Sequence, residues 1–332
     1  MEPTANNDRF PYRLFFLLFT SVALLILAGA WYVGNERIGN ELDLTRSNEI
    51  GTVVMGVRRL DDDLHAPFQQ LRPLLADPAV RQGVERGDGQ ALAAAFATLI
   101  GYNETIDHIR WIDENGMERA RVNNVDGRAL VVPAGELQDK SDSYYFHASM
   151  RLKPGQVYIS PLDLNVERGA VEVPHKPILR LAAPVQDGKG RARGILVINV
   201  AAKYFLDSFT DSLVGARDHA MLLNSEGYWL VGPNAEDAWG FMFKREKTLG
   251  GDHPQAWKAI SSIPSGQVED GDGLWTWSTV YPLKVDDDRA VTEIPRWLVV
   301  SHLPKSHLAM IRAGAWRAVG INTLLLLGLF GF

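Results

Sequence analysis

The sequence predicts an α+β protein in which a long N-terminal helix leads into two tandem lobes built on antiparallel sheets, flanked by transmembrane helices. Three observations support this fold class: an uncharged apolar stretch near the N-terminus, a hairpin-and-helix plan that occurs twice, and an apolar C-terminus. With 332 residues, 46% of them hydrophobic, the chain is long enough for about two domains with packed cores.

The first apolar stretch is Leu14–Val33, "LFFLLFTSVALLILAGAWYV", which contains no charge. At about 1.5 Å per residue a stretch of this length reaches roughly 30 Å, the thickness of the hydrocarbon core of a bilayer. Arginines precede it and an aromatic pair closes it, so we expect residues 1–13 to stay in the cytoplasm. The alternative is a cleaved signal peptide, because "AGAWYVG" offers small residues like those of a cleavage site.

The C-terminal stretch Ala318–Phe332, "AVGINTLLLLGLFGF", is predicted to be a second transmembrane helix that the sequence cuts short. A buried C-terminal helix of a soluble core is the alternative. Between the two spans, residues 34–314 would form one loop outside the cytoplasm, and a loop of that length is a folded domain. We therefore expect a protein of the inner membrane whose folded region faces the periplasm.

Apolar residues recur at spacings of three and four from Val53 to Leu75, which predicts a long helix over residues 34–75. This apolar stripe has two interpretations that the sequence leaves open. It packs against the chain's own sheet, or it forms the seam of a homodimer.

Beyond this helix, a strand, a glycine-containing turn and a second strand occur in His108–Asn123 and again in Ala220–Asn234. Each hairpin is followed by another, Ile178–Val200 and Thr276–Leu303, whose closing strand runs into helical sequence. A plan used twice predicts two similar lobes. The predicted boundaries are 76–207 for the first lobe, 208–304 for the second, and 305–332 for a linker helix and the second span.

The stretch "SDSYYFHASMRLKPGQVYISPLDLN" in the first lobe combines residues of a candidate pocket, Asp163 among them. The predicted ligand-binding residues are Arg121, Asp142, Tyr144, Tyr145, Tyr158, Ser160, Asp163, Arg180 and Asn199. It predicts a short helix, capped by Ser141, that carries Tyr144 and Tyr145, and then a strand with Tyr158 and Ser160 on one face. If that face is turned inward together with Arg180, the short helix closes over a small-molecule site, which is typically apolar or aromatic with a few directed polar groups. The alternative is the solvent-exposed face of an antiparallel sheet.

A membrane-tethered helix that leads into two such lobes resembles the extracytoplasmic double Cache (dCache) sensor of bacterial receptors, whose lobes are PAS-like. The resemblance covers residues 34–314, and the stretch from Val157 to Asn199 is similar to the membrane-distal lobe of sensors on histidine kinases and diguanylate cyclases. It implies a sensor module without catalytic residues or cofactors, which passes a conformational shift to an output domain beyond the C-terminus.

The resemblance also bears on the ligand. Amino-acid-sensing members of the family carry Arg-x-Trp-Tyr on the short helix, for the ligand carboxylate, and an Asp in Gly-Val-Val-Gly-x-Asp, for the ammonium. This sequence has Asp142 in place of the arginine and Asn199 in place of the aspartate, while an aromatic pair remains as Tyr144 and Tyr145. Free α-amino acids are therefore disfavoured ligands, although Arg121 or Arg180 could hold another small carboxylate.

Other kinds of site have little support. Asp163, Asn165 and Glu167 alternate like ligands of a hard cation, but a calcium loop needs more positions, so we expect a pinned loop and no metal. A net charge of −6 argues against nucleic-acid binding. The rival functions are a membrane-anchored enzyme of the cell envelope and a dimeric scaffold that binds nothing.

Overall fold

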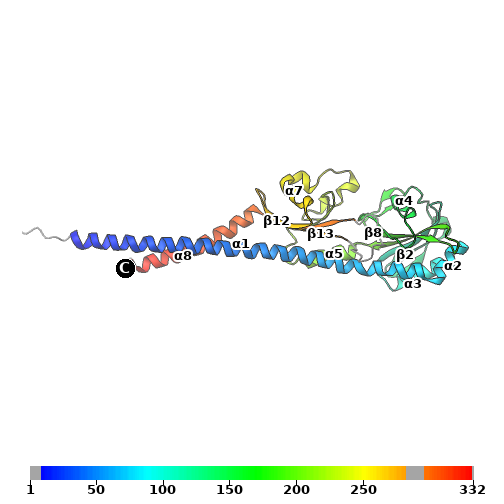
Figure 1. Cartoon of the computed structure of the whole chain (residues 1–332), viewed down its shortest axis with the longest axis horizontal. Helices are drawn as coiled ribbons and strands as arrows, with labels where there is room; N and C mark the ends of the chain where they lie inside the picture. The colour runs from blue at the N-terminus through cyan, green and yellow to red at the C-terminus, as the bar shows by residue number, and fades with distance from the viewer. Residues whose placement is uncertain (1–8, 282–294, 331–332) are drawn as a thin grey trace, which may run out of the picture. The chain divides into compact units, whose positions relative to one another are not determined.

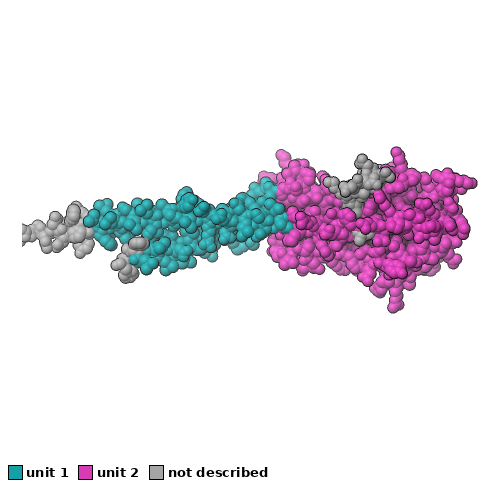
Figure 2. All heavy atoms as spheres, turned by 60° about the horizontal axis from the view of Figure 1, so that its bottom comes forward, with its two compact units in different colours: residues 1–51, 267–275, 302–332 teal, residues 52–266, 276–301 magenta. Residues whose placement is uncertain are grey.

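The structure is a computed structural model that describes residues 9–281 and 295–330 (Figure 1). Residues 1–8 of the expected cytoplasmic segment lie outside the described residues. The chain divides into two compact units, which Figure 2 colours separately. The first unit comprises residues 1–51, 267–275 and 302–332, and the second comprises residues 52–266 and 276–301.

Helix α1 (Arg9–Ala76) is one helix of 68 residues that continues through Pro67 and Pro73. Among the described residues it is the one helix long and apolar enough to cross a membrane, by length and composition. Most of the large apolar side chains between Leu14 and Val33 are exposed.

The apolar stripe of α1 is buried within the chain itself. Val53, Leu60, Leu64, Phe68 and Leu71 all belong to one hydrophobic core that also contains residues of the sheet described next. The prediction of packing against the chain's own sheet is confirmed. These side chains are not available to a second chain, so a dimer contact through α1 must use other residues.

The first lobe begins with α2 (Pro78–Arg86) and α3 (Gly89–Gly101), each started by an aspartate, Asp77 or Asp88, that accepts two backbone N–H groups. A sheet with strand order β3-β2-β1-β9-β8-β4, in which β5 also pairs with β8, forms its centre and is called the first sheet below. Its strands are β1 (Ile106–Ile112), β2 (Glu118–Val125), β3 (Arg128–Val131), β4 (Tyr158–Ile159), β5 (Asp163–Leu164), β8 (Pro177–Gln186) and β9 (Ala192–Ala201). The remaining elements are the short pair β6 (Val166–Glu167) and β7 (Ala170–Val171), a 3-10 turn η1 (Ala134–Glu136), α4 (Tyr144–Met150) and α5 (Lys203–Ser212).

The two faces of the first sheet differ in chemistry. Ile109, Trp111, Leu181, Leu196 and Ile198 lie in the core together with the apolar residues of α1, α2 and α3. Alternate residues of the same strands point to the opposite face, where α4 packs on β4, β8 and β9. Figure 1 shows α4 on one side of this sheet and α2 and α3 on the other. Both faces of the first sheet are therefore covered, one by α1, α2 and α3 and the other by α4.

The second sheet has strand order β11-β10-β14-β13-β12. Its strands are β10 (Ala220–Asn224), β11 (Trp229–Val231), β12 (Ser265–Glu269), β13 (Gly273–Val280) and β14 (Trp297–Pro304). Between β11 and β12 lie η2 (Ala235–Asp237), η3 (Gly240–Phe243), α6 (Leu249–Asp252) and α7 (Pro254–Ser262), and α8 (Lys305–Phe330) follows β14 directly. Most of the predicted turn between β13 and β14 lies outside the described residues.

The twice-used plan of hairpins followed by a helix is confirmed. The first hairpin of each sheet turns at a glycine with positive φ, 86° at Gly116 and 87° at Gly227. The closing strands β9 and β14 run into α5 and α8 as predicted. The prediction that Ser141 caps the short helix is wrong, because α4 begins at Tyr144 and the residue before it, Ser143, makes no side-chain capping bond.

The leucines at the end of α8 are exposed, with 71% of Leu324 and 77% of Leu329 accessible. The alternative of a helix tucked into a soluble core is therefore wrong. That α8 forms a second membrane span stays a prediction.

Candidate ligand-binding site

Four strands of the first sheet place charged and polar side chains on the face beneath α4. Residues paired directly across antiparallel strands lie on the same side of a sheet. Arg110 of β1 pairs with Arg121 of β2, while Asn199 of β9 pairs with both His108 of β1 and Arg180 of β8. Because His108 and Arg110 are two residues apart, these five residues occupy one face.

Helix α4 is attached to this face by an apolar cluster. Tyr145 and Phe146 are buried, and they pack with Ala182, Ile195 and Val197 of β8 and β9. The ring of Tyr145 also lies 5.4 Å from the guanidinium carbon of Arg180, at the distance of a cation–π contact.

Tyr144 connects α4 to the sheet by hydrogen bonds. Its hydroxyl donates to Oδ2 of Asp163 at 2.7 Å and accepts from Nη1 of Arg180 at 3.2 Å. The same Nη1 donates to Oδ1 of Asp163 at 2.5 Å, so the three groups form a closed triangle. Arg180 and Asp163 are buried, which strengthens this ion pair relative to an exposed one.

The triangle has a fixed charge distribution. Tyr144 is 47% exposed, but its hydroxyl is turned inward. Burial raises the pKa of this hydroxyl well above its ordinary value. Arg180 opposes this rise, and Asp163 adds to it. Burial lowers the pKa of Arg180, but Tyr144 and Asp163 outweigh it and hold that pKa above the usual range. The tyrosine therefore stays protonated and the arginine stays charged.

A second buried cation, Arg110, lies near the start of α4, where its Nη1 is 3.5 Å from the hydroxyl of Tyr145. Its Nη1 donates to Oε1 of Glu118 at 2.8 Å, its Nη2 contacts Nε2 of His108, and Nδ1 of His108 lies 2.7 Å from Oδ2 of Asp107. A neutral histidine with its proton on Nδ1 satisfies both contacts, because Nδ1–H then donates to the carboxylate and Nε2 accepts from the guanidinium.

Glu167, in the short pair β6–β7, accepts hydrogen bonds from several neighbouring side chains. Its carboxylate accepts from Nη2 of Arg121 at 3.0 Å, from the amide of Gln138 at 2.8 Å and from that of Asn165 at 3.4 Å, and Nζ of Lys140 is 3.8 Å away. Burial by itself raises the pKa of Glu167, but Arg121, Arg110 and Lys140 hold it well below its ordinary value. The loop that contains Asp163, Asn165 and Glu167 is therefore held in place by ion pairs and side-chain hydrogen bonds.

These groups border a cavity of about 680 Å³, called the α4 cavity below. Its volume lies within the range of small-molecule sites, roughly 300–1,000 Å³. The lining residues come from β1, α4, β5, β6, β8 and the segment before α4; they are Arg110, residues 138–145, Asp163, Asn165, Val166, Arg168, Gly169 and Arg180. Among the described residues, no group of three or more His, Asp or Glu side chains is arranged to hold a metal ion.

The comparison with protein families identifies the chain. The model of the family described as "Bacterial histidine kinase, sensor domain" matches residues 82–291, which is more than half of the sequence. The chain belongs to this family. The comparison with curated proteins found no match.

Solved structures show that the fold of this sensor domain is of the Cache type. The extracellular domain designated vpHK1S-Z8, described as that of a histidine kinase, is 18% identical with a TM-score of 0.68 over 82% of this chain and 95% of its own. A domain of a sensory box/GGDEF family protein from Vibrio parahaemolyticus is 19% identical with a TM-score of 0.67 over 81% and 99%. The ligand-binding domain of the Pseudomonas aeruginosa PAO1 amino acid chemoreceptor PctC in complex with GABA is 13% identical with a TM-score of 0.51 over 78% and 99%. At these identities the likeness concerns the fold alone, and it confirms the resemblance found in the sequence.

The sensor domain brings most of the predicted ligand-binding residues together. Asp142, Tyr144, Tyr145, Asp163 and Arg180 all line the α4 cavity. Their assignment to a ligand remains a prediction, but their convergence from three separate segments distinguishes a pocket from the solvent face of a sheet.

Four predicted residues of the sensor domain lie beside the cavity. Tyr158 packs against the cluster under α4, and the hydroxyl of Ser160 accepts from the backbone N–H of Arg180 at 2.9 Å and so holds β4 to β8. Arg121 is paired with Glu167. Asn199 is fully buried, and neither polar atom of its side chain has a hydrogen-bond partner among the described residues.

Sequence reasoning missed Arg110, Lys140 and Arg168, which line the cavity of the sensor domain. A signal for Arg110 was present, because His108 and Arg110 alternate with Ile109 and Trp111 in β1. No such signal exists for Lys140 or Arg168, which lie outside the long strands of the first sheet.

We expect the sensor domain to lose stability in mild acid through His108. Burial, aided by Arg110, lowers the pKa of His108 from 6.5 to about 3. Below pH 6.5 the unfolded chain therefore binds a proton that the folded chain does not, so stability falls as the pH falls, by about 2 kcal/mol between neutral pH and pH 5. Urea unfolding at pH 7.5 and pH 5 measures this loss. The His108→Gln variant should show a smaller loss, whereas the exposed His147→Gln should match the parent; equal losses in all three would contradict the assignment.

Proposed function

We propose that this sensor domain detects a small molecule in the α4 cavity and passes a conformational shift through α8 to a cytoplasmic output domain. The proposal includes an inner-membrane protein whose lobes face the periplasm. The observation that carries it is the triangle of Tyr144, Asp163 and Arg180, which ties α4 to the sheet at the wall of the cavity. A ligand that replaces one of these contacts binds one position of α4 better than another and shifts their populations.

The charges around the cavity favour an uncharged polar ligand. Arg180 is already paired with Asp163, and Arg110 with Glu118, so an anion must displace an existing carboxylate before it reaches either guanidinium. Of the other charged lining residues, Asp139 and Asp142 balance Lys140 and Arg168. Free α-amino acids are disfavoured for this reason, even though the PctC structure contains GABA.

A charge bridge in the first unit supports the relay. The carboxylate of Glu269, at the end of β12, accepts from Nη2 of Arg46 on α1 at 3.1 Å and from Nη2 of Arg312 on α8 at 2.8 Å. Beside it, Leu42 of α1 packs against a cluster that contains Leu308 of α8. One strand end therefore contacts both long helices, so a displacement of this strand changes the position of α8 relative to α1.

A homodimer is part of the proposal. Since the Val53–Leu75 stripe is internal, the surface that α1 offers to a second chain is a different one. Its exposed apolar residues between the first span and the first lobe are Leu44, Ile50, Val54 and Met55.

The ligand site is tested on the full chain in lipid nanodiscs by thermal unfolding against a panel of sugars, polyols, amides and free α-amino acids. We expect an uncharged compound to stabilise the parent, and Tyr144→Ala to weaken its binding about two- to tenfold, because a hydrogen bond between uncharged groups is worth roughly 0.5–1.5 kcal/mol. Tyr204→Ala is the matched control, since Tyr204 is a similarly exposed tyrosine that does not line the cavity. Stabilisation by several α-amino acids would overturn the ligand class, and a hit unaffected by Tyr144→Ala would overturn the site.

A further inference from the structure

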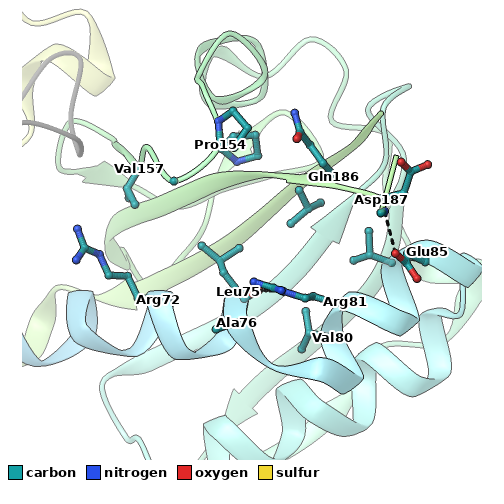
Figure 3. A pocket seen from close by; sticks show the side chains of 15 residues that line it. Arg72, Leu75, Ala76, Val80, Arg81, Glu85, Pro154, Val157, Gln186 and Asp187 are labelled. Atoms are coloured by element: carbon teal, nitrogen blue, oxygen red, sulfur yellow. Dashed lines mark hydrogen bonds between the residues drawn. The ribbon is translucent and has the colours of Figure 1, made fainter. Parts of the chain in front are cut away.

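A second cavity, of about 530 Å³, lies at the edge of the first sheet where α2 packs on β8 (Figure 3). It is called the α2 groove below. The two cavities have no lining residue in common. The groove is bordered by the last turn of α1, by α2, by the loop before β4 and by the start of the turn between β8 and β9.

The floor of the α2 groove is apolar and rigid. Val80, Val84 and Val157 line it, and each is at most 1% exposed because each belongs to the main core. The side chains of Leu75 and Val185 continue this surface. Val80, Val84 and Val157 are already buried, whereas Leu75 and Val185 are partly exposed and Ala76 is exposed, so an apolar body in the groove removes hydrophobic surface from water at these last three residues, which favours binding by about 25 cal/mol per Å².

The charged side chains that line the groove differ in how many of their polar atoms are hydrogen-bonded. Nε of Arg81 donates to the carbonyl of Leu75 at 3.2 Å, which fixes the guanidinium at the end of α1, while its two Nη atoms have no partner among the described residues. On the other side, Glu85 accepts from the backbone N–H of Gly188 at 2.8 Å, and Asp187 accepts from Arg191 at 2.7 Å. The acids therefore hold the β8–β9 turn, and Arg81 keeps two donors for another partner.

Figure 3 shows the side chains of Arg72 and Arg81 on the α1 side of the groove and Glu85 and Asp187 on the opposite side. The groove thus combines an apolar floor with positive charge at one side. A guanidinium presents a planar pair of donors that matches the two oxygens of a carboxylate.

We propose that the α2 groove is a second ligand site, which binds a small monocarboxylate with an apolar body. The carboxylate lies at Arg81, and the apolar body covers Leu75, Ala76 and Val185. A bound ligand contacts the end of α1, α2 and β8 at once, so it stabilises the packing of these three elements.

The probe is 3-phenylpropionate, titrated calorimetrically into the full chain in nanodiscs, with empty nanodiscs as the blank. We expect saturable binding to one site per chain. Arg81→Gln should weaken this binding about ten- to a hundredfold, because a charge-assisted contact is lost. Arg86→Gln is the matched control, since Arg86 lies on the same helix but does not line the groove.

Two further measurements separate this site from the α4 cavity and from partition into lipid. Tyr144→Ala should leave the affinity for 3-phenylpropionate unchanged, and the neutral analogue 3-phenylpropanol should bind at least about tenfold more weakly than the acid. The proposal is overturned by an absence of saturable binding above the blank, by equal affinities in the parent and Arg81→Gln, by equal affinities for acid and alcohol, or by loss of binding in Tyr144→Ala.

Discussion

Replacing Glu118 by glutamine is expected to lower the free energy of unfolding of the first lobe by about 3–5 kcal/mol, the cost of removing one partner of a buried ion pair. The Glu118 side chain has no exposed surface and that of Arg110 is 2% exposed, at a separation of 2.8 Å. Glutamine preserves the shape but removes the charge, and its amide group brings a donor to a site where Arg110 and the backbone N–H of Gln138 both donate. His108 cannot compensate, because it is neutral.

The loss is measured by hydrogen exchange of the β1 and β2 amides in the full chain. Glu114→Gln is the control, because Glu114 lies on the turn between the same strands, is 42% exposed, and contacts Arg193 only at 3.8 Å. It should change the stability by less than about 1 kcal/mol. The double replacement Arg110→Met with Glu118→Leu should recover most of the loss, since neither member of this ion pair is then left buried without its partner. A Glu118→Gln variant as stable as Glu114→Gln would show that Glu167, 3.9 Å from Arg110, is sufficient to neutralise it.

The second large effect is expected at Gly194, at the start of the core-forming part of β9. Its φ of 96° is one that side chains with a β-carbon rarely adopt, and a β-carbon built there would lie 1.9 Å from the carbonyl oxygen of Ile112 and 2.6 Å from the carbonyl carbon of Asp113. These are backbone atoms of β1 and its turn, so neither can rotate away as a side chain would. Gly194→Ala should therefore destabilise the first lobe by more than about 4 kcal/mol, since the strain of roughly 1–2 kcal/mol adds to a separation of β9 from β1.

Gly190→Ala is the matched control for Gly194→Ala. Gly190 also has positive φ, 75°, but no atom lies within 4 Å of the position that its β-carbon would take. Only the backbone strain remains there, so we expect a loss of about 1 kcal/mol. The comparison is made by the yield of folded chain and by urea unfolding. Equal stability of the two variants would contradict the close approach of β9 to β1.

Much of the architecture could be read from local patterns. The apolar stretch from Leu14 to Val33, the stripe from Val53 to Leu75 and the glycine turns at Gly116 and Gly227 each specify an element from neighbouring residues alone. The same holds for the short helix with Tyr144 and Tyr145, which was predicted correctly although its predicted cap, Ser141, was wrong. An element's type follows from its own hydrophobic period and turn chemistry, so the fold class was accessible without coordinates.

The sequence pattern could not show what the apolar stripe on α1 packs against. A period of three and four residues describes a buried face but does not say what buries it. Only the packing of Leu60, Leu64 and Leu71 with the first sheet decided between a core and a dimer seam.

The sequence by itself determined the long helix with its apolar N-terminal stretch, the two hairpin pairs and the position of the tyrosine-rich segment. Tertiary structure alone decided that Asp163 neutralises Arg180, that Glu167 pairs with Arg121, and that within residues 9–281 and 295–330 the two Nη atoms of Arg81 have no partner. The physical reason is that periodicity and turn chemistry act between residues close in the chain. A buried charge, in contrast, takes its partner from whichever segment the strand pairing brings within about 3 Å.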